Sequence, residues 1–323
     1  MKYRSSRFWP EHPAPGRKGD ESENTYPGLQ VLKSDKGMVL VLTLLVLVII
    51  TSIVVEFTYG VHTTTESLYN WKTLQRLSFV AKSGVSLAVK TISERESLSA
   101  YTYPAKTEMP VNNILTGFEG SVLISSEDEN SKLNLNSVLR VSDSYDSYES
   151  FKRLLRNLDL DESIAARVAD WIDRDNEPRL RGSEDGAKNA YMDSVDELLL
   201  IQGIDKETYG KLMPYVTVYG MIGRNSVNIN INTASIPVIM SLNEEMTEDV
   251  AEWIVYRREE IAPFVETDIG NEPVLSPLSG WITVKATNFR IVVVTEENRI
   301  RRIVEAVVEI KSDSNTVKYW REI

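Results

Sequence analysis

Cysteine is absent from the 323-residue chain, and histidine occurs only twice, at His12 and His62. Without cysteine the chain can form no disulfide, no thiolate nucleophile and no cysteine zinc site. Neither histidine has neighbours with which it would form a catalytic triad or a metal site, and no glycine-rich phosphate-binding loop stands out. These absences exclude the common hydrolase and kinase chemistries, and we predict that the protein is not an enzyme.

Positive charge is also scarce, because 36 Lys and Arg residues face 47 Asp and Glu residues, for a net charge of −11. The first 37 residues hold seven of the basic residues and five of the acidic ones, so the remaining chain carries −13. A body this acidic repels nucleic acid and phosphate-rich surfaces, whereas it can hold cations.

Charged residues are missing altogether from Met38 to Val55. Eighteen residues in a helix span about 27 Å, close to the hydrocarbon thickness of a bilayer. Lys33 and Lys36 precede this run, so the positive-inside rule places the leader in the cytoplasm and the rest of the chain outside. The sequence therefore predicts a single-pass anchor in membrane lipid.

The helical pattern does not stop where the apolar run ends. Apolar residues continue at a spacing of three and four to about Ile92, with Gly60 and Gly84 as candidate bends. We therefore predict one long helix over 38–92, half of it membrane-spanning and half amphipathic. An uncleaved signal anchor would also have such an apolar run, whereas a secretory signal fits less well because no small-residue cleavage site follows.

A basic leader that ends in Gly37, followed by a hydrophobic helix with an amphipathic second half, resembles the class III signal sequence of type IV pilins and pseudopilins. The resemblance implies cleavage between Gly37 and Met38 by a prepilin peptidase, and methylation of the new Met38 amine. Most members of these families carry Glu at the fifth mature position, where this chain has Leu42.

In these families that Glu pairs with the amine of the preceding subunit in apolar surroundings, where an unpaired carboxylate would be costly. A first subunit has no predecessor, so Leu42 suits a position at the filament tip. A degenerate anchor would lack the Glu as well.

Beyond the long helix, strand patterns lie at both ends of the remaining chain and helical patterns lie between them. Weak alternation predicts a strand over 120–125, and runs rich in β-branched residues predict three more over 289–294, 303–310 and 317–320. Helices are predicted over 147–158, 161–173, 195–202, 206–213, 234–242 and 247–260. This order predicts an α+β, pilin-like fold in which the long helix packs on a small antiparallel sheet that carries a large inserted all-α domain.

Five parts follow from this interpretation. They are the leader 1–37, the N-terminal transmembrane and amphipathic helix 38–92, the first part of the pilin-like core 93–136, the inserted α-helical domain 137–280, and the C-terminal strands 281–323.

Two stretches inside the insertion, 195–212 and 227–264, resemble helix-hairpin-helix units. DNA-binding versions present backbone N–H groups of a glycine-rich hairpin to a phosphate. The second hairpin here, Leu242–Met246, is acidic and has no glycine, which favours a packing motif. A membrane-anchored DNA receptor related to competence proteins is the alternative function, and the charge of −13 opposes it.

The densest group of carboxylates is Asp170, Asp173 and Asp175, followed by Glu184 and Asp185. Asp170 and Asp173 share a helix face, and the loop after them can fold back to bring the later residues close. Ca²⁺ takes six to eight oxygen ligands in flexible geometry, so such a cluster suits it. A solvated acidic loop with arginine partners, namely Arg174, Arg179 and Arg181, is the alternative.

The run DWIDRD from Asp170, the GSED at Gly182, the stretch 188–203, the NINTAS block from Asn230 and the end from Lys318 resemble the general secretion pathway protein K family, the large minor pseudopilins of type II secretion systems. The resemblance implies a calcium-binding insertion, with Asp173, Asp175, Glu184 and Asp185 as ligand candidates. It also implies a tip complex with minor pseudopilins I and J, contact with the inner-membrane assembly platform, and an inner-membrane anchor with the body in the periplasm. Its implied function is to initiate pseudopilus assembly and to support export across the outer membrane.

Overall fold

The structure is a computed structural model that describes residues 35–111, 118, 120–139, 146–220, 228–311 and 314–323. The predicted leader lies outside these residues, except for its last three positions. The chain divides into two compact units, residues 1–64 and 65–323.

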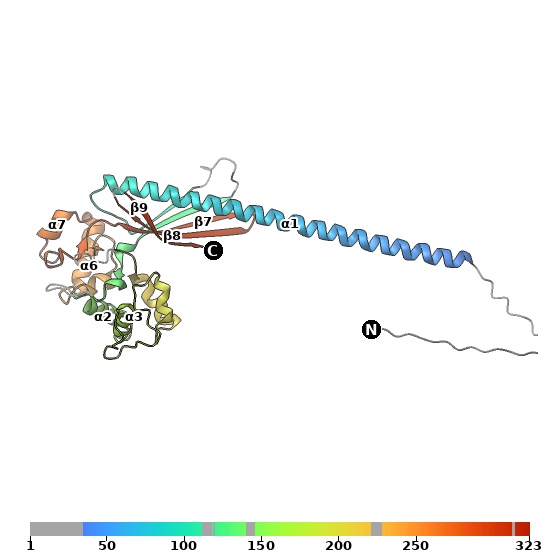
Figure 1. Ribbon diagram of the computed structural model, residues 1–323. Helices are drawn as coiled ribbons and strands as arrows, with labels where there is room; N and C mark the ends of the chain where they lie inside the picture. The colour runs from blue at the N-terminus through green and yellow to red at the C-terminus, as the bar shows by residue number, and fades with distance from the viewer. Residues whose placement is uncertain (1–34, 112–117, 119, 140–145, 221–227, 312–313) are drawn as a thin grey trace, which may run out of the picture. The chain divides into compact units, whose positions relative to one another are not determined.

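Helix α1 runs from Asp35 to Leu98 and is the longest element of the chain (Figure 1). In the first unit its side chains from Gly37 to Thr64 are all exposed, including the apolar run with Met38 and Leu42. By length and composition, this helix can cross a membrane. The predicted long helix is thus confirmed, and it continues six residues beyond the expected end at Ile92.

The second unit contains a five-stranded antiparallel sheet in the order β1-β2-β7-β8-β9. Its strands are β1 Lys106–Pro110, β2 Ser121–Asp128, β7 Asn288–Glu297, β8 Ile300–Ile310 and β9 Asn315–Glu322. The four strands predicted from sequence are present, whereas β1 was missed. Its sequence, KTEMP, contains a proline and little that favours a strand, which is typical of an edge position.

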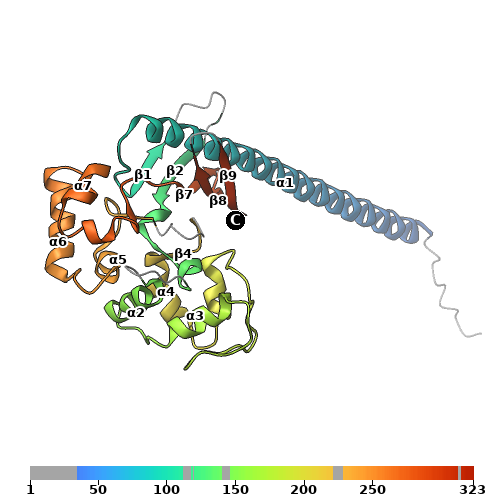
Figure 2. The same ribbon diagram turned by 60° about the vertical axis from the view of Figure 1, so that its left-hand side comes forward.

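The second half of α1 covers one face of this sheet (Figure 2). Apolar side chains four or three residues apart on α1 pack on alternate residues of β2, β7 and β8, as the helical and strand periods require. On α1 they are Ala81, Val85, Ala88 and Ile92. The structure gives Gly84 a packing role in an unbroken helix, because an added Cβ would lie 2.8 Å from the Val293 Cγ1 atom. Gly84 therefore allows the helix to approach the sheet closely.

The chain between β2 and β7 forms the insertion, so the sheet is interrupted between neighbouring strands. Its helices are α2 Ser147–Asn157, α3 Ile164–Ile172, α4 Lys206–Leu212, α5 Ile236–Ser241, α6 Glu248–Tyr256 and α7 Glu266–Asn271. Its 3₁₀ segments are η1 Glu129–Ser131, η2 Leu135–Ser137, η3 Val195–Leu200, η4 Met213–Tyr215 and η6 Ser276–Leu278, and η5 Arg257–Ile261 is π-helical. Two short parallel pairs complete it: β3 Leu133–Asn134 with β4 Val216–Thr217, and β5 Ile229–Asn230 with β6 Ile282–Thr283.

The predicted helices of the insertion are present, with differences at two places. The stretch predicted as a helix over 195–202 is the 3₁₀ segment η3, and the helix predicted over 247–260 changes to π-helix after Tyr256. The turn at Leu242–Met246 separates α5 and α6 as expected. The helix α7 and the two parallel strand pairs were not predicted, because each is too short to show a period.

Buried ions join the sheet to the insertion. Glu129 is fully buried at the end of β2, where it accepts hydrogen bonds from Lys132 Nζ at 3.0 Å and Arg290 Nε at 2.6 Å. The Thr217 hydroxyl donates to its other oxygen. Because Arg290 lies on β7 and Thr217 on β4, these bonds connect the sheet with the first half of the insertion. A carboxylate can be buried at this depth only with several such partners.

Candidate metal centre

The candidate centre begins at the end of α3. This helix buries almost all of its residues, and Asp170 in its last turn is completely buried. A buried carboxylate needs donors, and Arg179 supplies them from the following loop. Its backbone N–H lies 3.1 Å from Asp170 Oδ2, and its Nη1 atom lies 2.7 Å from Asp170 Oδ1. Arg179 also donates to Asp173 Oδ2, so one guanidinium joins the two aspartates.

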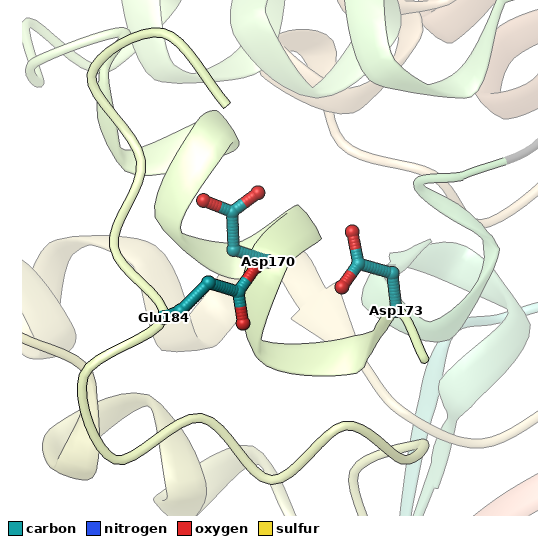
Figure 3. A group of neighbouring side chains, drawn as sticks. All are labelled: Asp170, Asp173 and Glu184. Carbon is teal, nitrogen blue, oxygen red and sulfur yellow. The ribbon is translucent and has the colours of Figure 1, made fainter. Parts of the chain in front are cut away.

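Glu184 reaches the same place from the loop that returns alongside α3 (Figure 3). One carboxylate oxygen from each of Asp170, Asp173 and Glu184 lies within 4.8 Å of the others. The close return requires Gly182, because an added Cβ there would lie 1.8 Å from Asp170 Oδ2. The structure therefore brings three carboxylates together, and the loop that carries Glu184 passes so close to Asp170 that only glycine fits at position 182.

The oxygens of this group are incompletely satisfied. Within the described residues, Asp173 Oδ1 and both Glu184 carboxylate oxygens are buried and accept no hydrogen bond. Burial, followed by the negative charges of Asp173, Asp170 and Asp175, raises the pKa of the Glu184 carboxyl. Three carboxylates against one guanidinium leave an excess of negative charge, so the group has both the charge and the free oxygens that a hard divalent cation requires.

Two of the four ligand residues predicted from the sequence lie in this group. The structure brings together Asp173 and Glu184, and it adds Asp170, which sequence reasoning had noted on the same helix face without counting it as a ligand. Asp175 and Asp185 are exposed and lie outside the group of three. Asp175 accepts a hydrogen bond from the Glu177 N–H at 3.0 Å.

The loop that carries Glu184 is held at its far end by ion pairs of Lys188. Lys188 Nζ lies 2.7 Å from Asp193 Oδ2 and 3.0 Å from Glu197 Oε1. Glu197 also accepts a hydrogen bond from Trp171 Nε1 at 3.2 Å, and Trp171 is the neighbour of Asp170. The carboxylate group is therefore connected to η3 through both ends of the loop.

The first predicted helix-hairpin-helix unit places Gly203 between η3 and α4, with a positive φ of 84°. A Cβ at Gly203 would lie 3.1 Å from Arg167 Cζ, so the chain's own guanidinium already lies against this glycine. This contact favours a packing role for the hairpin and gives the DNA-binding alternative no support. The helix-hairpin-helix assignment itself stays a prediction.

The remaining predicted positions lie on α1. Gly37 and Met38 are in its first turn, and the Met38 side chain is largely exposed. Leu42 is exposed in the same apolar half. Cleavage at Gly37 and a tip position signalled by Leu42 stay predictions.

A long helix that covers one face of a five-stranded antiparallel sheet, with a helical insertion between two of its strands, defines a pilin-like protein of mixed α and β structure. The family comparisons agree with this class. Residues 131–221 match the family model "Type II secretion system (T2SS), protein K" for its first domain, and residues 229–287 match a second model of the same description. Both halves of the insertion thus match the type II secretion system protein K family, as the sequence motifs had indicated.

Curated relatives carry the same description. The chain is 35% identical over 126 residues to type II secretion system protein K of Pectobacterium carotovorum, covering 33% of this chain and 38% of the relative. It is 31% identical over 141 residues to the protein of that name from Pseudomonas aeruginosa, covering 39% and 41%. The aligned part thus spans about two fifths of these relatives. A putative protein K of Escherichia coli is 23% identical, over 78% of both chains.

Among solved structures, the fold resembles a chain in the crystal structure of the GspK-GspI-GspJ complex from the enterotoxigenic Escherichia coli type 2 secretion system. The TM-score is 0.60 at 18% identity, and the match covers 78% of this chain and 97% of the other. At this identity the likeness establishes the fold, with its long helix on an antiparallel sheet.

Proposed function

We propose that this protein is a minor pseudopilin at the tip of the type II secretion pseudopilus, where it initiates assembly and supports export across the outer membrane. The observation that carries the proposal is Leu42 in the exposed apolar half of α1. A subunit with this residue needs no preceding amine, so it can stand first, and the matches to the two family models supply the system to which it belongs.

In this proposal the apolar half of α1 anchors the protein in the inner membrane, with the body in the periplasm. A prepilin peptidase removes the leader after Gly37, and the assembly platform then draws the helix into a bundle with partner helices. The likeness to a chain of the GspK-GspI-GspJ complex supports minor pseudopilins I and J as those partners. The insertion between β2 and β7 makes the subunit broad, which suits a terminal position.

A strain that lacks the gene tests this function. We expect the cargo to be made but retained in the periplasm, and wild-type protein to restore its secretion. Gly37→Val should fail to restore it, because a bulky residue at the junction blocks leader removal. The matched control, Gln30→Ala, changes the leader away from the junction and should restore secretion. Normal secretion without the gene would refute the proposal.

We further propose that Asp170, Asp173 and Glu184 hold a calcium ion with a structural role. The residues fit the ion, because three buried oxygens of the group accept no hydrogen bond and the group carries excess negative charge. Bound calcium would neutralise the carboxylates and hold the loop against α3. This assignment concerns the fold of the insertion and requires no catalytic step.

Thermal unfolding with and without a chelator tests the site. A ligand at about 100 times its dissociation constant stabilises by about 2.7 kcal/mol, which is several degrees for a body of this size. We expect the chelator to lower the unfolding midpoint of the wild type and to leave the Asp173→Asn, Glu184→Gln variant unchanged. The control, Asp175→Asn with Asp185→Asn, should keep the chelator response. An unfolding midpoint of the wild type that is the same with and without calcium would rule out the site.

A further inference from the structure

The two edges of the sheet differ in how well they are protected against pairing. The outer strand β1 has only five residues, ends at Pro110, and carries the ion pair of Lys106 Nζ with Glu108 Oε1 at 3.1 Å. Short length, proline and charge are the usual devices that keep an edge unpaired. The other edge, β9, has eight residues without proline, and in the described part of the chain it pairs only with β8. Edge β9 is therefore the one open to another strand.

The register identifies which backbone groups of β9 are free. Ile303 and Ile323 exchange both of their N–H···O bonds at 2.9 Å, so this is a hydrogen-bonded pair. Such pairs alternate along an antiparallel ladder with pairs that point away from each other. Trp320 and Glu322 lie opposite Ala306 and Val304 in the intervening pairs. Their backbone N–H and C=O groups therefore point away from β8, toward the open side.

The side chains of β9 differ between its two faces. Val317 and Trp320 lie on the same face of the sheet as α1, because they lie opposite Val308 and Ala306, which pack in the core beneath α1. Their exposed fractions are 55% and 40%, so α1 does not extend over these two side chains. Lys318 and Arg321 lie on the other face, and both side chains are about half exposed. Each already has an acidic partner, because Lys318 Nζ lies 3.1 Å from Glu309 Oε2 and Arg321 Nη1 lies 3.7 Å from Asp196 Oδ2. The edge thus presents apolar groups on one face and two half-exposed basic side chains on the other.

A cavity lies beside the face of β9 that carries Lys318 and Arg321. A cavity of ≈ 210 Å³ separates the sheet from η3 and α4, and its lining includes Tyr319, Arg321, Glu305 and Asp196. Arg321 lies 3.7 Å from Asp196, a loose pair at the surface. A side chain of an added strand can therefore reach Arg321 without displacing a packed residue.

We propose that β9 is a docking edge for an extended segment of a partner protein, which adds as a sixth strand and alternates apolar with acidic residues. Its main chain would bond to Trp320 and Glu322, its apolar residues would lie beside Val317 and Trp320, and its acidic residues beside Lys318 and Arg321. In strand addition the main chain supplies affinity and alternate side chains supply specificity. This inference does not depend on the proposed secretion function.

A short capped peptide of alternating valine and glutamate serves as the probe, with the full-length protein in detergent. We expect the peptide to bind and to slow hydrogen–deuterium exchange in residues 315–323. A peptide with lysine in place of glutamate should bind at least about tenfold more weakly, because its charges oppose Lys318 and Arg321. Equal binding of the two peptides, or unchanged exchange in β9, would overturn the proposal.

Trp320→Pro and Trp320→Thr separate the backbone from the side chain. Both variants lose the indole, but only proline removes the N–H that points away from β8, so the β8 ladder is preserved in each. We expect binding of the Val-Glu peptide to fall about tenfold further for proline than for threonine, at similar unfolding midpoints. Equal binding by the two variants, or dimers of the wild type that Trp320→Pro abolishes, would refute addition of an acidic partner strand.

Discussion

At the scale of single residues, Asp128 is a buried carboxylate outside the candidate metal centre. It ends β2, is almost completely buried, and accepts hydrogen bonds from Asn130 N at 2.7 Å, Asn230 Nδ2 at 2.8 Å and Thr233 Oγ1 at 2.6 Å. Desolvation outweighs these three bonds and raises its pKa to about 6. The folded protein therefore binds a proton at Asp128 more tightly than the unfolded chain does.

This shift predicts a pH dependence of defined sign. Between about pH 4 and 6 only the folded state holds the proton, so the free energy of unfolding attributable to Asp128 falls as the pH rises and is constant above pH 6. The change is on the order of 3 kcal/mol. Asp128→Asn should remove it, as measured by denaturant unfolding at pH 4 to 7 and compared with the wild type. The exposed control Glu108→Gln should follow the wild type, and a constant difference between wild type and Asp128→Asn across this range would contradict the prediction.

At the scale of elements, the insertion contains the same hydrogen-bond arrangement twice, each time around a buried asparagine. Asn136, two residues after Asn134, donates to the carbonyls of Met192 at 2.9 Å and Val218 at 3.0 Å and accepts from the Met192 N–H at 2.8 Å. Asn232, two residues after Asn230, makes the same three bonds with Phe264 and Val284, at 2.9, 3.4 and 2.7 Å.

The correspondence extends to the strands. Each Asn follows a short strand, β3 or β5, that pairs in parallel with a strand ending just before Val218 or Val284. The two halves of the insertion, which match separate family models, are thus held by equivalent buried amides. A buried asparagine satisfied at both ends fixes two distant segments at once, and this explains why two halves with few long helices remain compact.

This duplication shows where sequence reasoning reached its limit. Long periodic elements such as α2 and β8 were predicted from local patterns. The repeat was missed because the two halves share little beyond Asn-x-Asn, and the partners Met192 and Phe264 lie 56 and 32 residues away. In the candidate centre, the helical spacing of Asp170 and Asp173 is local and was predictable. The sequence showed that the following loop could bring Glu184 and Asp185 close, and the resemblance named both as ligands. That only Glu184 joins the group depends on the path of the loop past Gly182, and no spacing rule gives that path.

At the scale of the whole molecule, α1 is one continuous helix that contributes to both units of the chain. Its residues up to Thr64 belong to the first unit, and its residues from Thr65 onward belong to the second unit, the body of the protein. In the body, Leu77, Ala81, Val85, Ala88 and Ile92 are at most 4% exposed and supply the helical side of the core under the sheet. The second half of α1 is thus part of the core, whereas the body needs nothing from the first half to complete that core.

A pair of fragments tests this division. Residues 65–323 retain every core side chain of α1, so we expect them to be soluble and to unfold in one cooperative transition at the same midpoint as the full-length protein. Residues 100–323 would expose the sheet face around Ile291 and Val293, and burial of each large aliphatic side chain contributes about 1.5 to 3 kcal/mol. We therefore expect this shorter fragment to lose cooperative unfolding and to bind a hydrophobic dye. Calorimetry and dye fluorescence of the two fragments make the comparison. Equal stability of the fragments would show that α1 merely lies on a sheet that folds without it.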